Sequence, residues 1–111
     1  MKFYKKNDII YTSLNGNLDE VALDVNNVDA SFEKHVPHIL IEGSNVTVKV
    51  GEVNHPMEDF HYIEFIMVET KNGMQFKKLN PGDKPMACFN LVDDEFIKAY
   101  AYCNLHGMWE K

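Results

Sequence analysis

The sequence of 111 residues is poor in cysteine and contains no long hydrophobic segment. Its two cysteines, Cys88 and Cys103, cannot build the disulfide framework typical of small secreted domains. The first residues lead directly into Asn7-Asp8 without the apolar region of a signal peptide. No apolar run is long enough to span a bilayer. These absences predict a single globular protein of the cytoplasm, where thiols stay reduced, with no membrane partner.

Amphipathic helices, internal repeats and low-complexity segments are also missing from the sequence. Acidic residues outnumber basic ones by 17 to 11, which gives a net charge of −6. This charge argues against a nucleic acid or an anionic lipid surface as a partner. An anionic substrate would need local positive charge at its binding site, because the field of the whole protein repels it.

Short segments of β-branched and aromatic residues recur along the chain, separated by turn signals roughly every ten residues. This spacing is typical of an all-β Greek-key sandwich. We expect Asn-Gly turns at residues 15–17 and 71–73, the first joining a strand at 9–12 to one at 21–23. The other expected strands cover residues 38–42, 46–53, 61–70, 74–79, 86–92 and 96–102.

Three local features of these segments lead to further expectations. Strict alternation in segment 61–70 would place His61, Ile63, Phe65 and Met67 on one face. Pro37 disfavours a helix just before it, so residues 33–37 are expected to form an extended loop. Cys88 lies in an apolar run and is expected to be a small buried side chain.

Four of the five histidines and one cysteine fall in three short clusters. The clusters are Glu33-Lys34-His35-Val36-Pro37, then His55-Pro56-Met57 with His61 close behind, and Cys103-Asn104-Leu105-His106-Gly107-Met108-Trp109. Imidazole and thiolate are characteristic ligands of transition metals. The pattern therefore predicts one mononuclear metal site with the candidate ligands His35, His55, His61, Cys103 and His106, and Glu33 as a further candidate.

The residues alone leave two metals open. A structural zinc site is closed, tetrahedral and usually rich in cysteine, which this set does not match. A cupredoxin-like electron carrier would use two histidines, Cys103 and an axial Met108 for copper, but leaves two histidines and the pair Glu33-Lys34 without a role. Iron with four imidazoles in a plane and one axial thiolate uses the whole set, and Lys34 would favour an anion at its open position.

Taken together, these segments resemble the signature of the superoxide reductases, the family of desulfoferrodoxin and neelaredoxin. The likeness runs from about Val28 to Trp109 and includes the strand that leads to His55. The resemblance implies an immunoglobulin-like β-sandwich with one non-haem iron per chain at its surface. It also implies one-electron reduction of superoxide to hydrogen peroxide, without release of dioxygen.

The resemblance implies a role for each residue of the site. His35, His55, His61 and His106 would be the equatorial ligands, with His106 at the position that uses its other ring nitrogen. Cys103 would be the axial thiolate. Apart from the resemblance, the position of residues 104–106 just past Cys103 predicts that their backbone N–H groups bond to its sulfur. Glu33 would cap ferric iron and leave on reduction. Lys34 would attract superoxide and assist protonation of the peroxide.

The sequence departs from desulfoferrodoxins at its N-terminus. Those proteins carry a small domain there with four cysteines and a second iron, whereas no cysteine precedes Cys88 here. We therefore expect residues 1–28 to be a shortened, metal-free appendage and residues 29–111 to be the iron-binding domain. The resemblance further implies a homo-oligomer, a dimer or a tetramer, that receives electrons from rubredoxin or another small donor.

Overall fold

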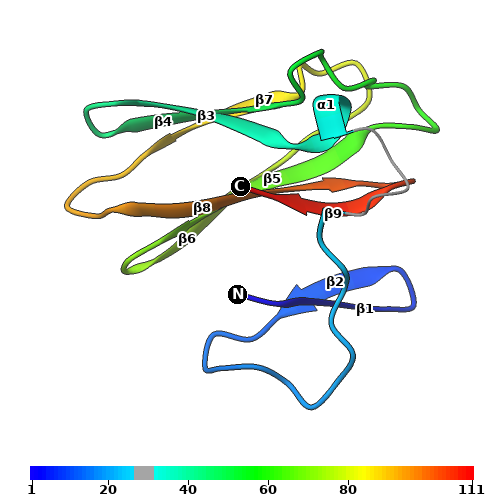
Figure 1. The fold of residues 1–111 in the computed structure, drawn as a ribbon, viewed down its shortest axis with the longest axis horizontal. Helices are drawn as coiled ribbons and strands as arrows, with labels where there is room; N and C mark the ends of the chain where they lie inside the picture. Colours follow the sequence, from blue (N-terminus) through cyan, green and yellow to red (C-terminus); the bar gives the residue numbers. More distant parts are fainter. Residues whose placement is uncertain (27–31) are drawn as a thin grey trace.

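The computed structural model describes residues 1–26 and 32–111, and Figure 1 shows that β-strands make up most of it. One short helix, α1, precedes seven strands of the main body, and two strands form an N-terminal hairpin (Figure 1). The elements are β1 (Phe3–Lys6), β2 (Ile9–Thr12), α1 (Phe32–His35), β3 (Pro37–Glu42), β4 (Asn45–Val50), β5 (Ile63–Thr70), β6 (Gly73–Lys78), β7 (Met86–Asn90), β8 (Phe96–Cys103) and β9 (Gly107–Glu110).

The main body consists of two antiparallel sheets. One has the strand order β3-β4-β7 and the other has the order β6-β5-β8-β9. The chain changes sheet between β4 and β5, between β6 and β7, and again between β7 and β8. These crossings confirm the expected all-β, immunoglobulin-like Greek-key sandwich. The described residues include no helix long and apolar enough to cross a membrane.

The core between the two sheets follows from the alternation of side chains along each strand. In β4, Val46, Val48 and Val50 are buried while Lys49 is exposed. In β8, Ala99, Ala101 and Cys103 join the same core. The intervening Tyr100 and Tyr102 point to the outer face of the four-stranded sheet. Cys103 therefore enters the candidate site from the inner face, at the very end of a buried strand.

A bulge in β5 corrects the expected face assignment of segment 61–70. The pairing of β5 with β8 shifts between Ile63 and Phe65, so Glu64 is an extra residue on β5. Ile63 consequently lies in the main core with Ile66 and Val68, whereas Phe65 packs on the outer face. The prediction that Ile63 shares a face with Phe65 was wrong, because simple alternation does not anticipate the inserted residue.

The N-terminal hairpin also differs from the prediction. β2 pairs with β1 through a turn at Asn7 and Asp8, whose φ angles are 51° and 63°. Asn and Asp tolerate this left-handed conformation. The expected pairing of 9–12 with 21–23 through Asn15–Asn17 was therefore wrong. Phe3 of β1 and Ile10 of β2 pack against the outer face of the four-stranded sheet and belong to a second, smaller core there.

Three other expectations about local structure were incomplete or wrong. Residues 32–35 form one helical turn, although an extended loop was expected, and the helix does end before Pro37. Cys88 is exposed, because the alternation of β7 turns its neighbours Ala87 and Phe89 inward instead. β9 lies beyond the last strand expected from the sequence, which covered residues 96–102. The boundary placed between residues 28 and 29 lies outside the described residues.

Candidate metal centre

Each of the three sequence clusters becomes a loop or a helical turn at one end of the sandwich. His35 ends α1, and His55 and His61 lie in the connection between β4 and β5. Cys103 ends β8, and His106 lies in the tight turn before β9. Because the strands of a rigid sandwich hold the ends of these loops, side chains distant in sequence meet at one point.

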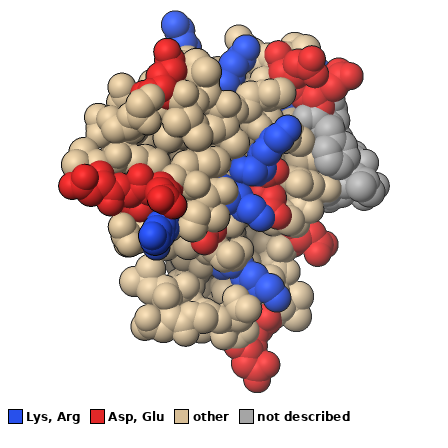
Figure 2. Space-filling model, turned by 60° about the vertical axis from the view of Figure 1, so that its left-hand side comes forward, with Lys and Arg blue, Asp and Glu red and all other residues tan. Residues whose placement is uncertain are grey.

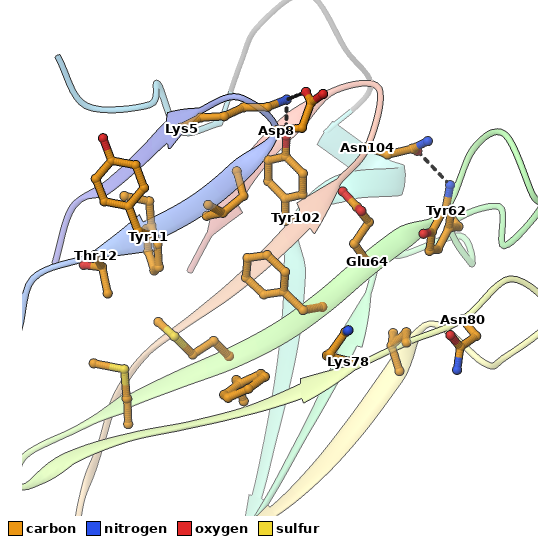
Figure 3. Close-up of a pocket in the computed structure, with 17 residues that line it drawn as sticks. Lys5, Asp8, Tyr11, Thr12, Tyr62, Glu64, Lys78, Asn80, Tyr102 and Asn104 are labelled. Atoms are coloured by element: carbon orange, nitrogen blue, oxygen red, sulfur yellow. Dashed lines mark hydrogen bonds and ion pairs between the residues drawn. The ribbon is translucent and has the colours of Figure 1, made fainter.

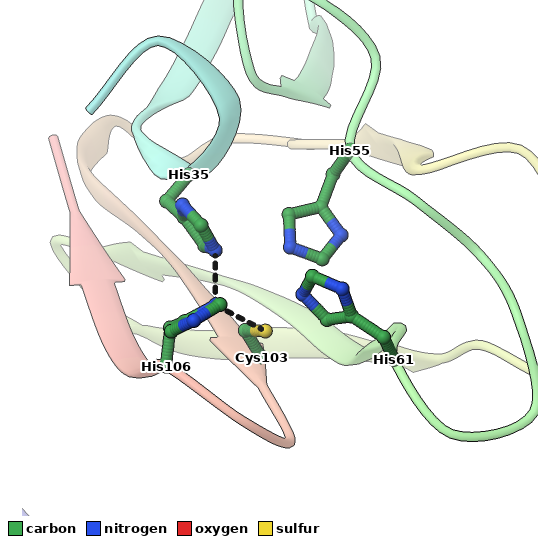
Figure 4. A group of neighbouring side chains, drawn as sticks. All are labelled: His35, His55, His61, Cys103 and His106. Atoms are coloured by element: carbon green, nitrogen blue, oxygen red, sulfur yellow. Dashed lines mark hydrogen bonds between the residues drawn. The ribbon is translucent and has the colours of Figure 1, made fainter. Parts of the chain in front are cut away.

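Figure 4 shows the four imidazoles and the thiolate converging on a common space. Their five candidate ligand atoms all lie within 4.8 Å of one another. Neighbouring rings form a cycle with centroid distances of 4.6, 4.8, 5.1 and 4.7 Å, in the order His35, His55, His61, His106. The diagonal pair His35–His61 is 6.4 Å apart and close to parallel, at 30°. This is the arrangement of four ligands at the corners of a square.

The distances between donor atoms match the requirements of a metal ion. Nε2 of His35 lies 3.0 Å from Nδ1 of His106, which in turn lies 3.8 Å from Sγ of Cys103. Metal–imidazole bonds of about 2.0–2.1 Å place two ligand nitrogens at right angles about 3 Å apart. The nitrogen that His106 directs to the centre is thus Nδ1, whereas His35 directs Nε2.

Two ring nitrogens of the site take part in no hydrogen bond with the described residues. Among the described residues, Nε2 of His55 and Nε2 of His61 are buried without any hydrogen-bond partner. An unsatisfied buried polar atom costs about 1–3 kcal/mol. The two costs are offset if both nitrogens bind a cation, so the residues present fit a metal ion.

The imidazole of His55 is held in the state that a metal ligand needs. Its Nδ1 lies 2.7 Å from the carbonyl oxygen of Pro56. A carbonyl only accepts, so Nδ1 carries the proton and Nε2 keeps its lone pair toward the centre. Burial lowers the pKa of His55 to about 4, and the neighbouring imidazoles act in the same direction. The ring is therefore neutral at pH 7.

Opposing effects act on the thiol of Cys103. Burial raises its pKa, while the backbone N–H groups of Leu105 and His106 bond to the sulfur and lower the pKa. These two groups confirm the expected N–H···S bonds for residues 105 and 106. The backbone N–H of Asn104 instead donates to the carbonyl of Tyr62 at 3.2 Å. A cation beside the sulfur would add the missing stabilisation of the thiolate.

Glu33 and Lys34 lie on α1 with exposed side chains, outside the group of converging ligand atoms. Lys34 is near enough to affect the centre electrostatically. Burial, then His106, then the charge of Lys34 lower the pKa of His61. Figure 2 shows lysines and acidic residues interspersed over the visible face of the molecule. Lys34 thus supplies positive charge close to the metal centre, although the protein as a whole carries a net charge of −6.

Backbone contacts fix α1 beside the loop that follows β4. The N–H of Glu52 donates to the carbonyl of Glu33 at 2.6 Å, and the N–H of Gly51 donates to that of Val36 at 3.1 Å. Gly51 has a φ of +88°, and a Cβ added there would lie 2.6 Å from the carbonyl oxygen of Lys34. Only glycine allows this close approach. The sequence contained Gly51 but gave no signal of its role.

Sequence reasoning missed the role of Trp109. The indole of Trp109 stacks on His35 at 4.8 Å and 24°, and its Nε1 donates to the carbonyl of His106 at 3.1 Å. Met108 lies in the outer core with Phe3. Met108 is consequently not positioned to serve as the axial ligand that a copper carrier requires.

The family model described as desulfoferrodoxin matches residues 27–111 of this chain. A desulfoferrodoxin homologue from Archaeoglobus fulgidus is 49% identical over 88 residues, which cover 79% of this chain and 70% of that protein. The superoxide reductase from Treponema pallidum is similar in structure, with a TM-score of 0.78 and 44% identity over 81% of this chain and 75% of that one.

The one-iron superoxide reductase from Giardia intestinalis is also similar, with a TM-score of 0.61 and 36% identity. It matches 71% of this chain and 95% of its own length. The similarity to this protein therefore covers nearly its whole length.

The lowered pKa of His55 predicts that the metal-free protein loses stability in acid. The folded value of about 4 lies below the ordinary 6.5, so the unfolded chain binds the proton first as the pH falls. The contribution to the free energy of unfolding is complete above pH 6.5 and declines toward pH 4, by at most about 1.4 kcal/mol per pH unit. Urea unfolding of the apoprotein across this range measures it.

Two variants identify the source of this acid sensitivity. His55→Gln should flatten the dependence between pH 6.5 and 4, whereas His38→Gln, which changes an exposed residue of β3, should behave as the parent does. Equal pH profiles for His55→Gln and the parent would contradict the assignment to His55.

Proposed function

The chain belongs to the desulfoferrodoxin family, and from that premise we propose that it is a superoxide reductase. In the proposed reaction one superoxide ion takes up one electron and two protons to give hydrogen peroxide, without release of dioxygen. The observation that carries the proposal is the cluster of four histidines and one cysteine, with a lysine close enough to influence it.

Iron is the cofactor of this family, and the ligands proposed for it are His35, His55, His61, Cys103 and His106. When bound there, iron would supply the electron and a position at which superoxide can bind, and the thiolate of Cys103 would donate electron density to it. The N–H groups of Leu105 and His106 moderate that donation, because each draws charge from the sulfur.

Glu33 and Lys34 are proposed to act at the solvent side of the centre. Both side chains are exposed on the same helical turn that ends with the buried His35. The ammonium group of Lys34 would attract superoxide against the net negative charge of the protein and assist proton transfer to the peroxide. The carboxylate of Glu33 is proposed to cap ferric iron and to leave on reduction. An electron carrier with a saturated metal would use neither residue.

Four further proposals rest on the family resemblance and the sequence. The electron comes from rubredoxin or another small redox protein, and the protein forms a dimer or a tetramer. It works in the reducing cytoplasm, consistent with two free cysteines. Residues 1–28 are a shortened, metal-free remnant of an N-terminal domain, and residues 29–111 are the iron-binding domain. The described part of residues 1–28 contributes no side chain to the ligand cluster.

The stoichiometry of the reaction tests the proposed function. Iron-loaded protein reduced with ascorbate is mixed with superoxide, and hydrogen peroxide and dioxygen are measured together. A reductase yields one hydrogen peroxide for each superoxide and no dioxygen. Release of one dioxygen for every two superoxide ions would show that the protein is a dismutase instead. If the reduced protein did not consume superoxide, the result would favour an electron carrier.

Replacing Lys34 with alanine should slow the encounter with superoxide and leave the metal bound. At low ionic strength we expect the second-order rate constant to fall at least about tenfold, and its dependence on salt to weaken. Lys71→Ala removes the same charge after the far end of β5 and should retain the parent's rate. Equal rate constants for Lys34→Ala and the parent at low salt would contradict the proposal that Lys34 attracts superoxide.

Replacing Glu33 with alanine should open ferric iron to added anions. We expect azide to bind the oxidised variant more tightly than the parent, because no carboxylate competes for the sixth position. Optical titration of the oxidised protein gives both affinities, and Glu42→Ala, an exposed position on β3, serves as the control. Unchanged azide affinity in Glu33→Ala would show that Glu33 is not the sixth ligand.

A further inference from the structure

The side chain of Asn104 joins the two loops that carry His61 and Cys103. Its Oδ1 accepts a hydrogen bond from the N–H of Tyr62, and its Nδ2 donates to the carbonyl of Phe60, both at 3.0 Å. Its backbone N–H donates to the carbonyl of Tyr62 at 3.2 Å. We infer that Asn104 is a positioning residue, which fixes the imidazole of His61 relative to the axial thiolate. This inference rests on the proposed function.

These three bonds hold the residues on both sides of His61. His61 itself exchanges two backbone hydrogen bonds with Glu58, at 2.9 and 3.1 Å. Those bonds close the loop on itself and do not tie it to the turn after β8. β5 begins only at Ile63, so His61 precedes the sheet. Beside the pairing of Ile63 with Cys103 at the start of β5, the side chain of Asn104 connects the His61 loop to the Cys103 turn.

The position of Asn104 in the chain gives it a second effect. It directly follows Cys103 and directly precedes Leu105 and His106, whose N–H groups bond to the sulfur. The same turn also places Nδ1 of His106 in the centre. A shift of this turn would therefore alter an imidazole ligand and the hydrogen bonds to the thiolate together. Partners of this kind orient ligands and set the properties of the metal.

Asn104 also lines a cavity outside the group of five ligands. A cavity of about 830 Å³ lies between the N-terminal hairpin and the outer face of the four-stranded sheet, and it contains none of the five ligands. Figure 3 shows Asn104 and Tyr62 bonded to each other at one end of this cavity, with Glu64 nearby. Open space therefore lies behind the Asn104–Tyr62 contact. The loops could move into it if the hydrogen bonds were lost.

Anaerobic titration of the apoprotein with Fe²⁺ tests this role. Asn104→Ala removes both side-chain bonds and should weaken Fe²⁺ binding about 10- to 100-fold. Asn104→Asp keeps the acceptor for Tyr62 but loses the donor to Phe60, and should give a smaller loss. Asn90→Ala is the matched control and should bind Fe²⁺ as the parent does, because Asn90 bonds to Asn45 within the three-stranded sheet, which carries none of the bonds of Asn104.

Spectroscopy separates positioning from a general loss of stability. Asn104→Ala should shift the thiolate-to-iron absorption band and lower the reduction potential, because the N–H···S bonds loosen. Thermal unfolding of the apoproteins should show no larger loss for Asn104→Ala than for Asn90→Ala. An unchanged band and potential, or an affinity loss matched by Asn90→Ala, would overturn the inference.

A double-mutant cycle tests whether Asn104 acts through His61. His61→Ala alone should weaken Fe²⁺ binding, and adding Asn104→Ala should then cost much less than it costs in the parent. Full additivity of the two losses would contradict the inference. Fe²⁺ affinity does not depend on reactivity with superoxide, so a parent that binds iron but fails to reduce superoxide would disprove the proposed function alone.

Discussion

The structure depends on the convergence of four imidazoles and one thiolate at a single point. Each group is costly there on its own, since His55 and His61 hold buried nitrogens with no partner among the described residues, and burial opposes ionisation of Cys103. One cation offsets these costs together, because it accepts every lone pair and stabilises the thiolate. The contacts that hold α1 beside the loop after β4, and the position of Lys34 on α1, both bear on this centre.

The β-sandwich makes this convergence possible at a surface. Alternating side chains bury Val46, Val48 and Val50 on one strand and carry Cys103 to the end of another. The ligands themselves lie in short connections held by backbone contacts, such as those at Gly51 and Glu52. The chain thus combines a buried core with ligands held in the connections at one end of the sandwich.

The overall fold and the five side chains that converge on the candidate centre could be predicted from the sequence, because both follow from patterns of neighbouring residues. Period-two alternation and the Asn72-Gly73 turn indicated strands of the main body, and three clusters of histidine and cysteine indicated the candidate metal site. Features that depend on tertiary context could not be predicted. The bulge at Glu64, the turn at Asn7-Asp8, the stacking of Trp109 on His35 and the bonds of Asn104 appear only when distant segments are placed together.

The metal content and visible spectrum of the purified protein test the central claim most directly. The account predicts about one iron per chain and, in the oxidised protein, a thiolate-to-ferric charge-transfer band. The band should bleach with ascorbate, return on addition of superoxide, and be lost in Cys103→Ser. Copper with an intense blue band, or iron with no thiolate band, would contradict a centre built from these four histidines and Cys103.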